Sequence, residues 1–189
     1  MASTLRTRAF AFWLIALAGC GVDLLTKSIV FRRLGMPDFD NPKPPWWIWE
    51  PYFGLQTSLN EGALFGIGQG KVWLFASLSV VAIFGVCYWL YFAGAAADRM
   101  LTVALAMIMG GILGNLHDRL GLWEPPELVG VRYYAVRDWI LFQWNGWVWP
   151  NFNIADSLLV CGVALLVWHA YRHGDAKQSS DVERVAPPV

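Results

Sequence analysis

The chain has 189 residues and no net charge at neutral pH; 57% of its residues are hydrophobic and only 15% are charged. Soluble domains carry about 25% charged residues, so this composition favours a membrane protein. A neutral chain without a basic segment also argues against a nucleic-acid partner. The twelve tryptophans support the membrane interpretation, because indole side chains concentrate at the membrane–water interface.

Four apolar segments are long enough to cross a bilayer, which takes roughly 20 helical residues. They cover about 9–31, 72–92, 100–120 and 154–171. We therefore predict an all-α membrane protein, a four-transmembrane-helix bundle forming a single membrane-embedded domain over residues 1–172. Residues 173–189 are polar and cannot form a core, so we expect a disordered tail there.

The first apolar segment raises the question of whether it is a span or a cleaved signal. Its residues Leu17 to Cys20 look like the cleavage motif of a bacterial lipoprotein signal. The apolar region of a signal is about 7–15 residues long and ends at its cleavage site. Here the apolar run continues to Phe31, so we predict a span. Within it, Asp23 and Lys27 lie four residues apart on one helix face and can form an ion pair.

The cysteines give no sign of a disulfide framework or a zinc site. Cys20, Cys87 and Cys161 each lie inside an apolar segment, and their number is odd. We predict that all three are small buried apolar side chains.

Two long loops, 32–71 and 121–152, are predicted on the side of the membrane opposite the termini, whereas the connection 93–99 is short. Prolines exclude a regular helix in PKPPWWIWEPYF, and the weak alternation of Tyr52 to Leu59 indicates a short strand. Lysine and arginine are divided almost equally between the two sides, so charge does not give the orientation. Because function concentrates on loops, we expect the chemistry on the long-loop side.

Polar residues gather at the end of the third span, in GGILGNLHDRL. Ionisable groups inside spans are costly and usually mark functional sites. The stretch holds the polar residues Asn115, Asp118 and Arg119, and the small residues Gly110, Gly111 and Gly114. The glycines would allow another helix backbone to approach closely.

Two further carboxylates flank the start of the fourth span. Asp138 lies in VRDWILF and Asp156 in NFNIADS, three residues after Asn153. Asn153 and Asp156 fit a helix cap, and a catalytic role for Asp156 stays open beside that interpretation. If the neighbouring Arg137 and Asp138 are on an extended segment, their side chains point to opposite faces.

Two carboxylates held close together can carry out chemistry. They cannot both ionise easily, so one holds a proton while the other acts as a base. Such a pair can activate a water and protonate a leaving amine, which is amide hydrolysis without a covalent intermediate. The sequence lacks a serine nucleophile motif, and His169 and His173 lie at the other end of the predicted bundle from His117. We therefore expect no metal and no cofactor.

Four stretches occur together in this order: GVDLLTK, LNEGALFGIG, GGILGNLHDRL, and VRDWI followed by FNIADS. This set resembles the signal peptidase II family, the lipoprotein (prolipoprotein) signal peptidases. The resemblance implies an aspartyl endopeptidase of the bacterial inner membrane. It would cleave the signal peptide from diacylglyceryl-modified prolipoproteins just before the lipidated cysteine.

The resemblance also assigns roles and partners. It makes Asp138 and Asp156 the catalytic pair, places Asn60, Gly62, Asn115, Arg119 and Asn153 around the site and substrate, and gives Asp23 and Lys27 a supporting role. It implies cytoplasmic termini, a catalytic pair near the outer, periplasmic face, and a small β-rich cradle in the first outer loop. The implied partners are prolipoprotein substrates, membrane lipids and globomycin-type inhibitors.

This chain departs from the family pattern at several points. The segment between Arg119 and Asp138 is longer, and WEPPELVGVRYY looks inserted. The first outer loop is also long, and His117 stands where an aliphatic residue is usual.

Two other classes of protein remain as alternatives. A small transporter or channel would need polar residues across the whole bilayer, whereas here most gather toward one side. A structural membrane protein would not explain four ordered motifs.

Overall fold

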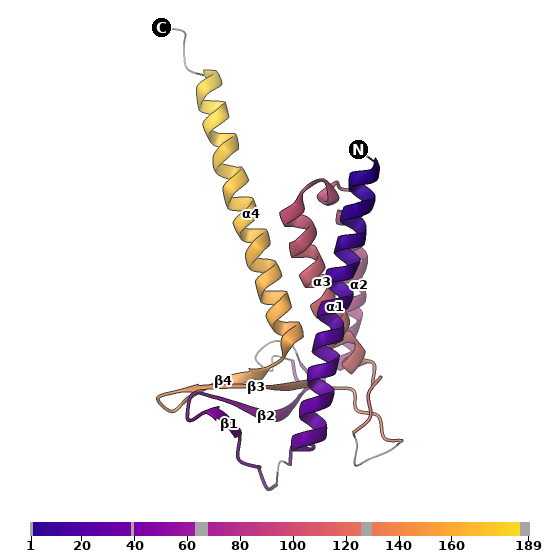
Figure 1. Cartoon of the computed structure of the whole chain (residues 1–189), viewed down its shortest axis with the longest axis vertical. Helices are drawn as coiled ribbons and strands as arrows, with labels where there is room; N and C mark the ends of the chain where they lie inside the picture. The colour runs from indigo at the N-terminus through magenta and orange to yellow at the C-terminus, as the bar shows by residue number, and fades with distance from the viewer. Residues whose placement is uncertain (1, 39, 63–67, 126–129, 186–189) are drawn as a thin grey trace.

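The computed structural model describes residues 2–38, 40–62, 68–125 and 130–185. Four long helices meet one end of a small sheet, and the first helix continues past it (Figure 1). The start of the first helix and the end of the last lie at the end of the bundle that is far from the sheet. The elements in chain order are α1 Ala2–Leu34, β1 Trp46–Trp49, β2 Phe53–Asn60, α2 Val72–Tyr91, the 3₁₀ turn η2 Ala95–Ala97, α3 Arg99–Arg119, β3 Val136–Trp144, β4 Trp147–Phe152 and α4 Ile154–Val185.

The four predicted spans are confirmed as helices. In the described part of the chain, four helical segments of 20 to 30 residues are long and apolar enough to cross a membrane. Helix α1 begins earlier than predicted, and α4 continues beyond the predicted span end at Tyr171. Residues 173–185, for which we expected disorder, are helical in the structure. Their Ala, Lys, Gln and Glu residues have good helix propensity, so a composition that excludes a core does not exclude a helix.

Helix α3 is the central helix of the bundle and contacts α1, α2 and α4. The predicted close approach at its glycines is confirmed. A Cβ atom on Gly110 would lie 2.9 Å from the carbonyl oxygen of Ala16, and one on Gly111 would lie 2.5 Å from that of Ala155. These contacts are too short for any side chain, so the glycines let α1 and α4 pack directly on the backbone of α3.

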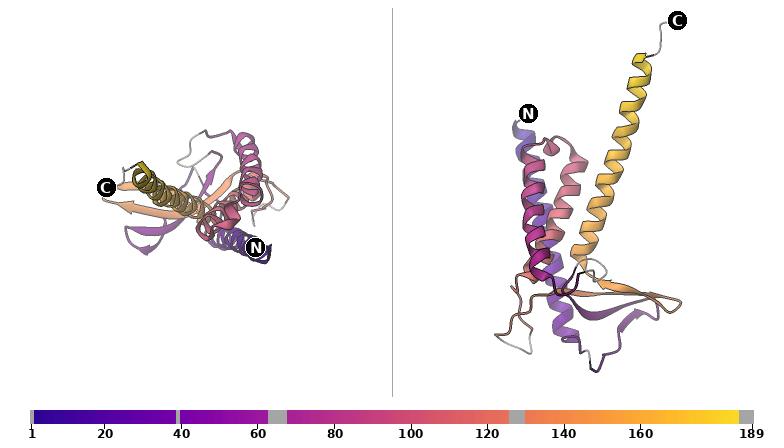
Figure 2. Two further views of the ribbon diagram at one scale, coloured as in Figure 1. Left: turned by 90° about the horizontal axis from the view of Figure 1, so that it is seen from above. Right: turned by 180° about the vertical axis from the view of Figure 1, so that it is seen from behind.

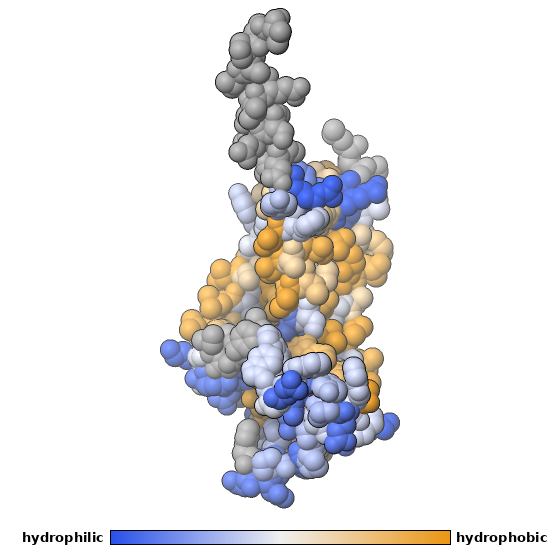
Figure 3. Space-filling view, turned by 90° about the vertical axis from the view of Figure 1, so that its left-hand side faces the viewer, coloured by the Kyte–Doolittle hydropathy of each residue, from blue (hydrophilic) through white to orange (hydrophobic). Residues whose placement is uncertain are grey.

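The outer faces of the helices are apolar. Figure 3 shows hydrophobic residues over the middle of the helices and hydrophilic residues at both ends. This surface includes Phe10, Phe84 and Val167, each more than half exposed. The prediction of three buried cysteines is wrong, because Cys161 is exposed and Cys20 and Cys87 are partly exposed. An apolar span residue can face lipid as readily as a core, and the sequence does not distinguish the two.

The sheet is antiparallel, has four strands in the order β1-β2-β3-β4, and extends sideways from the end of the helices (Figure 2). Strand β2 confirms the strand predicted at Tyr52 to Leu59. We expected the second long connection, 121–152, to be a loop, but in the structure it also contains strands β3 and β4. The turn between them uses Asn145 and Gly146 with φ of 48° and 79°, which matches the twist of a two-residue hairpin.

Candidate active site

The sheet register places Asp138 beside the start of α4. Asp138 lies opposite Ser58 of β2, and two residues later Ile140 lies opposite Phe152, the last residue of β4. The Asp138 side chain is 2% exposed. Its Oδ1 accepts a hydrogen bond from Nδ2 of Asn153 at 2.6 Å, and its Oδ2 accepts one from Nδ2 of Asn60 at 3.2 Å.

Asp156 lies in the first turn of α4, where it forms a reciprocal cap with Asn153. The backbone N–H of Asp156 donates to Oδ1 of Asn153 at 3.0 Å, and the backbone N–H of Asn153 donates to Oδ2 of Asp156 at 3.2 Å. The capping interpretation is therefore confirmed. Capping leaves Oδ1 of Asp156 to accept a hydrogen bond from Nδ2 of Asn115 on α3, at 2.8 Å.

Asn153 connects the two carboxylates. Its side-chain amide donates to Asp138, and its backbone and side chain both bond Asp156. The negative charge of Asp156 also acts directly on Asp138. The sequence spacing permitted this proximity without requiring it, and the structure shows it. We refer to Asp138 and Asp156 below as the carboxylate pair.

Burial sets the protonation of Asp138, which lies outside the membrane-spanning helices. Loss of hydration, followed by the negative charge of Asp156, raises the pKa of Asp138 to about 8. The hydrogen bonds from Asn153 and Asn60 oppose this rise without cancelling it. Asp138 is therefore mostly protonated at neutral pH and can act as an acid.

Arg119 lies at the end of α3 next to the pair. Its Nη2 donates to the carbonyl oxygen of Gly62 at 3.0 Å, and its guanidinium lies 5.7 Å from the centre of the Phe75 ring. Its positive charge interacts with both carboxylates of the pair. Gly62, which directly follows Glu61 after β2, is thus tied to the end of α3. The site residues named from the sequence on β2, α3, β3 and α4 are therefore brought together.

A second group of charges lies behind the pair and is fully buried. Nζ of Lys27 is 2.7 Å from Oδ2 of Asp23, 3.3 Å from Oδ2 of Asp118 and 2.9 Å from Oδ1 of Asn115. Nη2 of Arg137 is 2.7 Å from Oδ1 of Asp118. We call Asp23, Lys27, Asp118 and Arg137 the buried ion cluster. Arg137 points away from Asp138, as expected for neighbours on an extended strand.

The Asp118–Arg137 bridge was not anticipated from the sequence. Asp118 stood out only as one polar residue of GGILGNLHDRL, and nothing in the spacing paired it with Arg137. Residues of the inserted segment complete this contact, since the Arg137 guanidinium lies 4.7 Å from the ring centre of Trp123. Trp123 also packs edge-on against Phe31 of α1. The longer loop therefore covers the end of the α1–α3 contact that lies next to the sheet.

The charges of the buried ion cluster and of the carboxylate pair explain why the pair holds one proton. The buried ion cluster contains two acids and two bases, so it is neutral by itself. The carboxylate pair with Arg119 would carry one excess negative charge if both acids were ionised. Burying an uncompensated charge is costly, so one proton on the pair is the favoured state. That proton fits on Asp138, the carboxyl whose pKa is raised to about 8.

Asp23 also holds α4 in place. Its Oδ1 accepts a hydrogen bond from the backbone N–H of Ala155, one of the free donors at the start of α4, at 2.9 Å. A Cβ atom on Gly114 would lie 2.5 Å from the other oxygen of Asp23, so the glycine makes room for it. The supporting role expected for Asp23 and Lys27 thus has a geometric basis: they fix the turn that carries Asp156.

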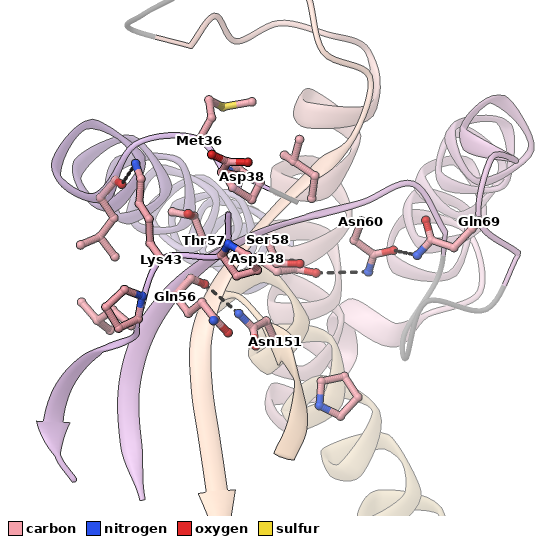
Figure 4. A pocket seen from close by; sticks show the side chains of 17 residues that line it. Met36, Asp38, Lys43, Gln56, Thr57, Ser58, Asn60, Gln69, Asp138 and Asn151 are labelled. Atoms are coloured by element: carbon pink, nitrogen blue, oxygen red, sulfur yellow. Dashed lines mark hydrogen bonds between the residues drawn. The ribbon is translucent and has the colours of Figure 1, made fainter. Parts of the chain in front are cut away.

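A polar cavity of about 480 Å³ reaches Asp138 from the side of the sheet that faces the segment between α1 and β1 (Figure 4). Its walls are β2 and the segment between α1 and β1, with one corner from β4. The polar side chains that line it are Asp38, Lys43, Gln56, Thr57, Ser58, Asn60, Gln69, Asp138 and Asn151. Nδ2 of Asn151 donates to the carbonyl oxygen of Gln56 at 2.7 Å and joins two of these walls. We call this space the outer cavity.

The fold and the site together define a class of protein. Four helices that are apolar enough to cross a membrane meet a small tryptophan-rich sheet, and the carboxylate pair, with Asp138 buried and Asp156 partly buried, lies where they meet. The sequence profile of the family described as Signal peptidase (SPase) II matches residues 15–172. The chain belongs to the signal peptidase II family, so it is a peptidase of bacterial membranes.

Individual relatives agree with this assignment. The chain is 44% identical over 182 residues to the lipoprotein signal peptidase of Rhodopirellula baltica, covering 93% of this chain and 80% of the relative. It is 32% identical to that of Symbiobacterium thermophilum, covering 82% and 90%. A solved bacterial membrane enzyme, determined by the in meso method at 2.3 Å, superimposes with a TM-score of 0.73 at 25% identity, covering 88% of this chain and 91% of that one.

Proposed function

We propose that this protein is an aspartyl endopeptidase that removes the signal peptide from diacylglyceryl-modified prolipoproteins, cutting just before the lipidated cysteine. The observation that carries the proposal is the carboxylate pair, with Asp138 buried and Asp156 partly buried, bridged by Asn153. The names of the relatives supply the substrate class. The aspartyl mechanism rests on the site itself.

In the proposed reaction, Asp156 is the base and Asp138 the acid. Asp156 takes a proton from a water as the water attacks the scissile carbonyl carbon, and its place at the start of a helix favours its ionised form. Asp138 gives its proton to the leaving amine of the cysteine, so the carbon–nitrogen bond breaks without a covalent intermediate. Asn115, Asn153 and Asn60 hold the two carboxylates in position, and Arg119 with Gly62 limits the space around them.

We propose that the signal helix of the substrate lies among α2, α3 and α4 with its lipid tails toward the bilayer. The termini then lie in the cytoplasm and the sheet lies on the outer face. The exposed Trp46, Trp49, Trp144 and Trp147 of the sheet suit the headgroup layer there. A globomycin-type inhibitor would compete for the same space. The outer cavity is the water-filled exit for the polypeptide that follows the cysteine.

The direct test is gel-shift cleavage of a purified diacylglyceryl prolipoprotein by the purified protein in detergent. Cleavage is expected just before the modified cysteine, as read by mass spectrometry of both products. The matched substrate has serine in place of that cysteine and therefore lacks the lipid, and it should not be cleaved. Cleavage of both substrates, or of neither, would contradict the proposed activity.

The pH dependence of cleavage should show the loss of the acid. Because the pKa of Asp138 is raised to about 8, the proton needed by the leaving amine is present below that pH and absent above it. The rate constant at saturating substrate is therefore expected to fall as pH rises through about 8, by about tenfold per unit once Asp138 is mostly ionised. A rate that stays flat to pH 10 would show that Asp138 does not supply the proton.

The outer cavity predicts a dependence on the substrate chain after the cysteine. Filling it with an indole, as in Thr57→Trp on β2 or Met36→Trp on the opposite wall, should raise KM about tenfold for a substrate that continues well beyond the cysteine. A substrate ending two residues after the cysteine should be unaffected. The control is Asp40→Trp, which puts the same group on the same loop outside the cavity lining. Equal effects on both substrates would rule out this exit path.

A further inference from the structure

Three metal-binding side chains meet at the end of the bundle opposite the sheet. Asp98 precedes α3, and His169 and His173 lie one turn apart on α4. One potential ligand atom from each lies within 4.8 Å of those of the other two. The two histidine rings are stacked, with centres 4.0 Å apart and an angle of 21° between their planes. This group is remote from the carboxylate pair, and the proposed reaction does not use it.

The ligand atoms of Asp98 and His169 are separated by a distance typical of two ligands bound to the same metal ion. Nε2 of His169 lies 3.3 Å from Oδ2 of Asp98. That nitrogen is buried, and among the described residues its contact with Asp98 lacks the alignment of a full hydrogen bond. Two atoms bound to one tetrahedral zinc ion at about 2.0–2.2 Å lie about 3.3–3.6 Å apart and point at the ion instead of each other.

Two of these side chains, His173 and Asp98, each make a second contact of the kind that usually orients a metal ligand. Nδ1 of His173 lies 2.9 Å from the carbonyl oxygen of His169; a carbonyl can only accept, so Nδ1 carries the hydrogen and the neutral ring keeps its lone pair on Nε2. Oδ1 of Asp98 caps α3 by accepting from the N–H of Leu101 at 2.9 Å, which leaves Oδ2 available. The ligands are thus oriented by contacts within the fold.

From this geometry we propose that Asp98, His169 and His173 form a binding site for a divalent transition-metal ion of the zinc class. Imidazole and carboxylate together suit zinc, and water would complete a tetrahedral set. The side chain of His173 is exposed and can rotate to close the remaining distance. The bound ion would join α4 to the α2–α3 connection and so reinforce the Asp98–His169 contact between them.

The surroundings limit the affinity. Arg8, Arg99 and Arg172 line the same cavity and oppose a cation. Arg8 is already occupied, because it donates to the carbonyl oxygens of Ala96 and Ala97. An anion attracted by the arginines is the competing occupant. We favour a metal ion over an anion because three ligand atoms converge, and each side chain is oriented by another bond or by burial.

The test is a zinc titration of the full-length protein in detergent, with any purification tag removed, followed by calorimetry. Wild type should bind one Zn²⁺ per chain. His173→Ala and Asp98→Asn should each weaken binding by more than about tenfold, the loss typical of even an outer-sphere change at a metal site. Asn caps helices as well as Asp, so Asp98→Asn removes the ligand charge and keeps α3 capped. His117→Ala, the remaining histidine, is the matched control and should bind as wild type.

Thermal unfolding supplies a second measurement. Zn²⁺ should raise the Tm of wild type and of His117→Ala and leave that of His173→Ala unchanged, because only a ligand bound to the folded state stabilises it. Absence of Zn²⁺ binding by wild type, or binding by His173→Ala and Asp98→Asn that is as tight as that of wild type, would overturn the proposal. Binding of inorganic phosphate that depends on Arg172, without zinc binding, would assign the cavity to an anion.

Discussion

An Asp138→Asn variant is expected to remain folded and to lose cleavage of a diacylglyceryl prolipoprotein by about 10³-fold or more. A positioned acid or base contributes typically 10²–10⁴-fold, and here the removed acid belongs to a pair that acts on one water and one amide. Asn copies the shape and neutrality of the protonated carboxyl, so Asn153 can still bond it. Gel-shift rates at saturating substrate measure the loss, and circular dichroism with unfolding in detergent checks the fold.

Two further variants distinguish the loss of a catalytic carboxylate from the general effect of removing a negative charge. Asp156→Asn should lose activity to a similar extent, because the two carboxylates act as a unit and their losses do not add. Asp40→Asn changes an exposed carboxylate of the outer loop and should cleave as wild type. A folded Asp138→Asn protein with normal cleavage would remove the aspartyl mechanism while leaving the family assignment intact.

The sequence predicted the helices well because each span is a long, mainly apolar segment, and a bilayer imposes both the length and the helical form. It also predicted the contacts within a few residues of each other, such as the Asn153–Asp156 cap and the Asp23–Lys27 pair. In both cases helix geometry alone fixes the distance. The strand β2 was recognisable because its apolar residues alternate.

The contacts that complete the site depend on segments far apart in the chain. Apolar and polar residues do not alternate regularly in β3 and β4, which are rich in tryptophan. Aromatic residues can lie on both faces of a sheet that rests against a membrane, so the pattern that marks a strand is lost. The bridge between Asp118 and Arg137 joins a helix end to a strand, and Asp98 meets His169 from another helix. No local spacing encodes these pairs. The residues themselves made Asp138 and Asp156 candidates and the family resemblance implied their catalytic role, but the sheet register was needed to explain their proximity.

The buried ion cluster predicts the largest effect on stability. Lys27→Met should lower the free energy of unfolding by about 3–5 kcal/mol, because Asp23 and Asp118 are both buried and would then face Arg137 alone. Cleavage should fall as well, since Asp23 holds the backbone N–H of Ala155 and thereby the turn that carries Asp156. Unfolding of the purified protein in mixed detergent measures the first effect, and the gel-shift rate measures the second.

A double variant distinguishes lost charge balance from lost packing. Asp23→Asn in the Lys27→Met background removes the unpaired charge, while the amide oxygen can still accept from Ala155. We expect this second change to restore much of the stability, although Asp23→Asn alone should destabilise; such coupling is typical of residues in direct contact. Lys71→Met, at an exposed lysine, should change stability by no more than about 0.5 kcal/mol. If Lys27→Met proved as stable as Lys71→Met, the cluster would not be what fixes α4, and the carboxylate pair would depend on the Asn153 cap alone.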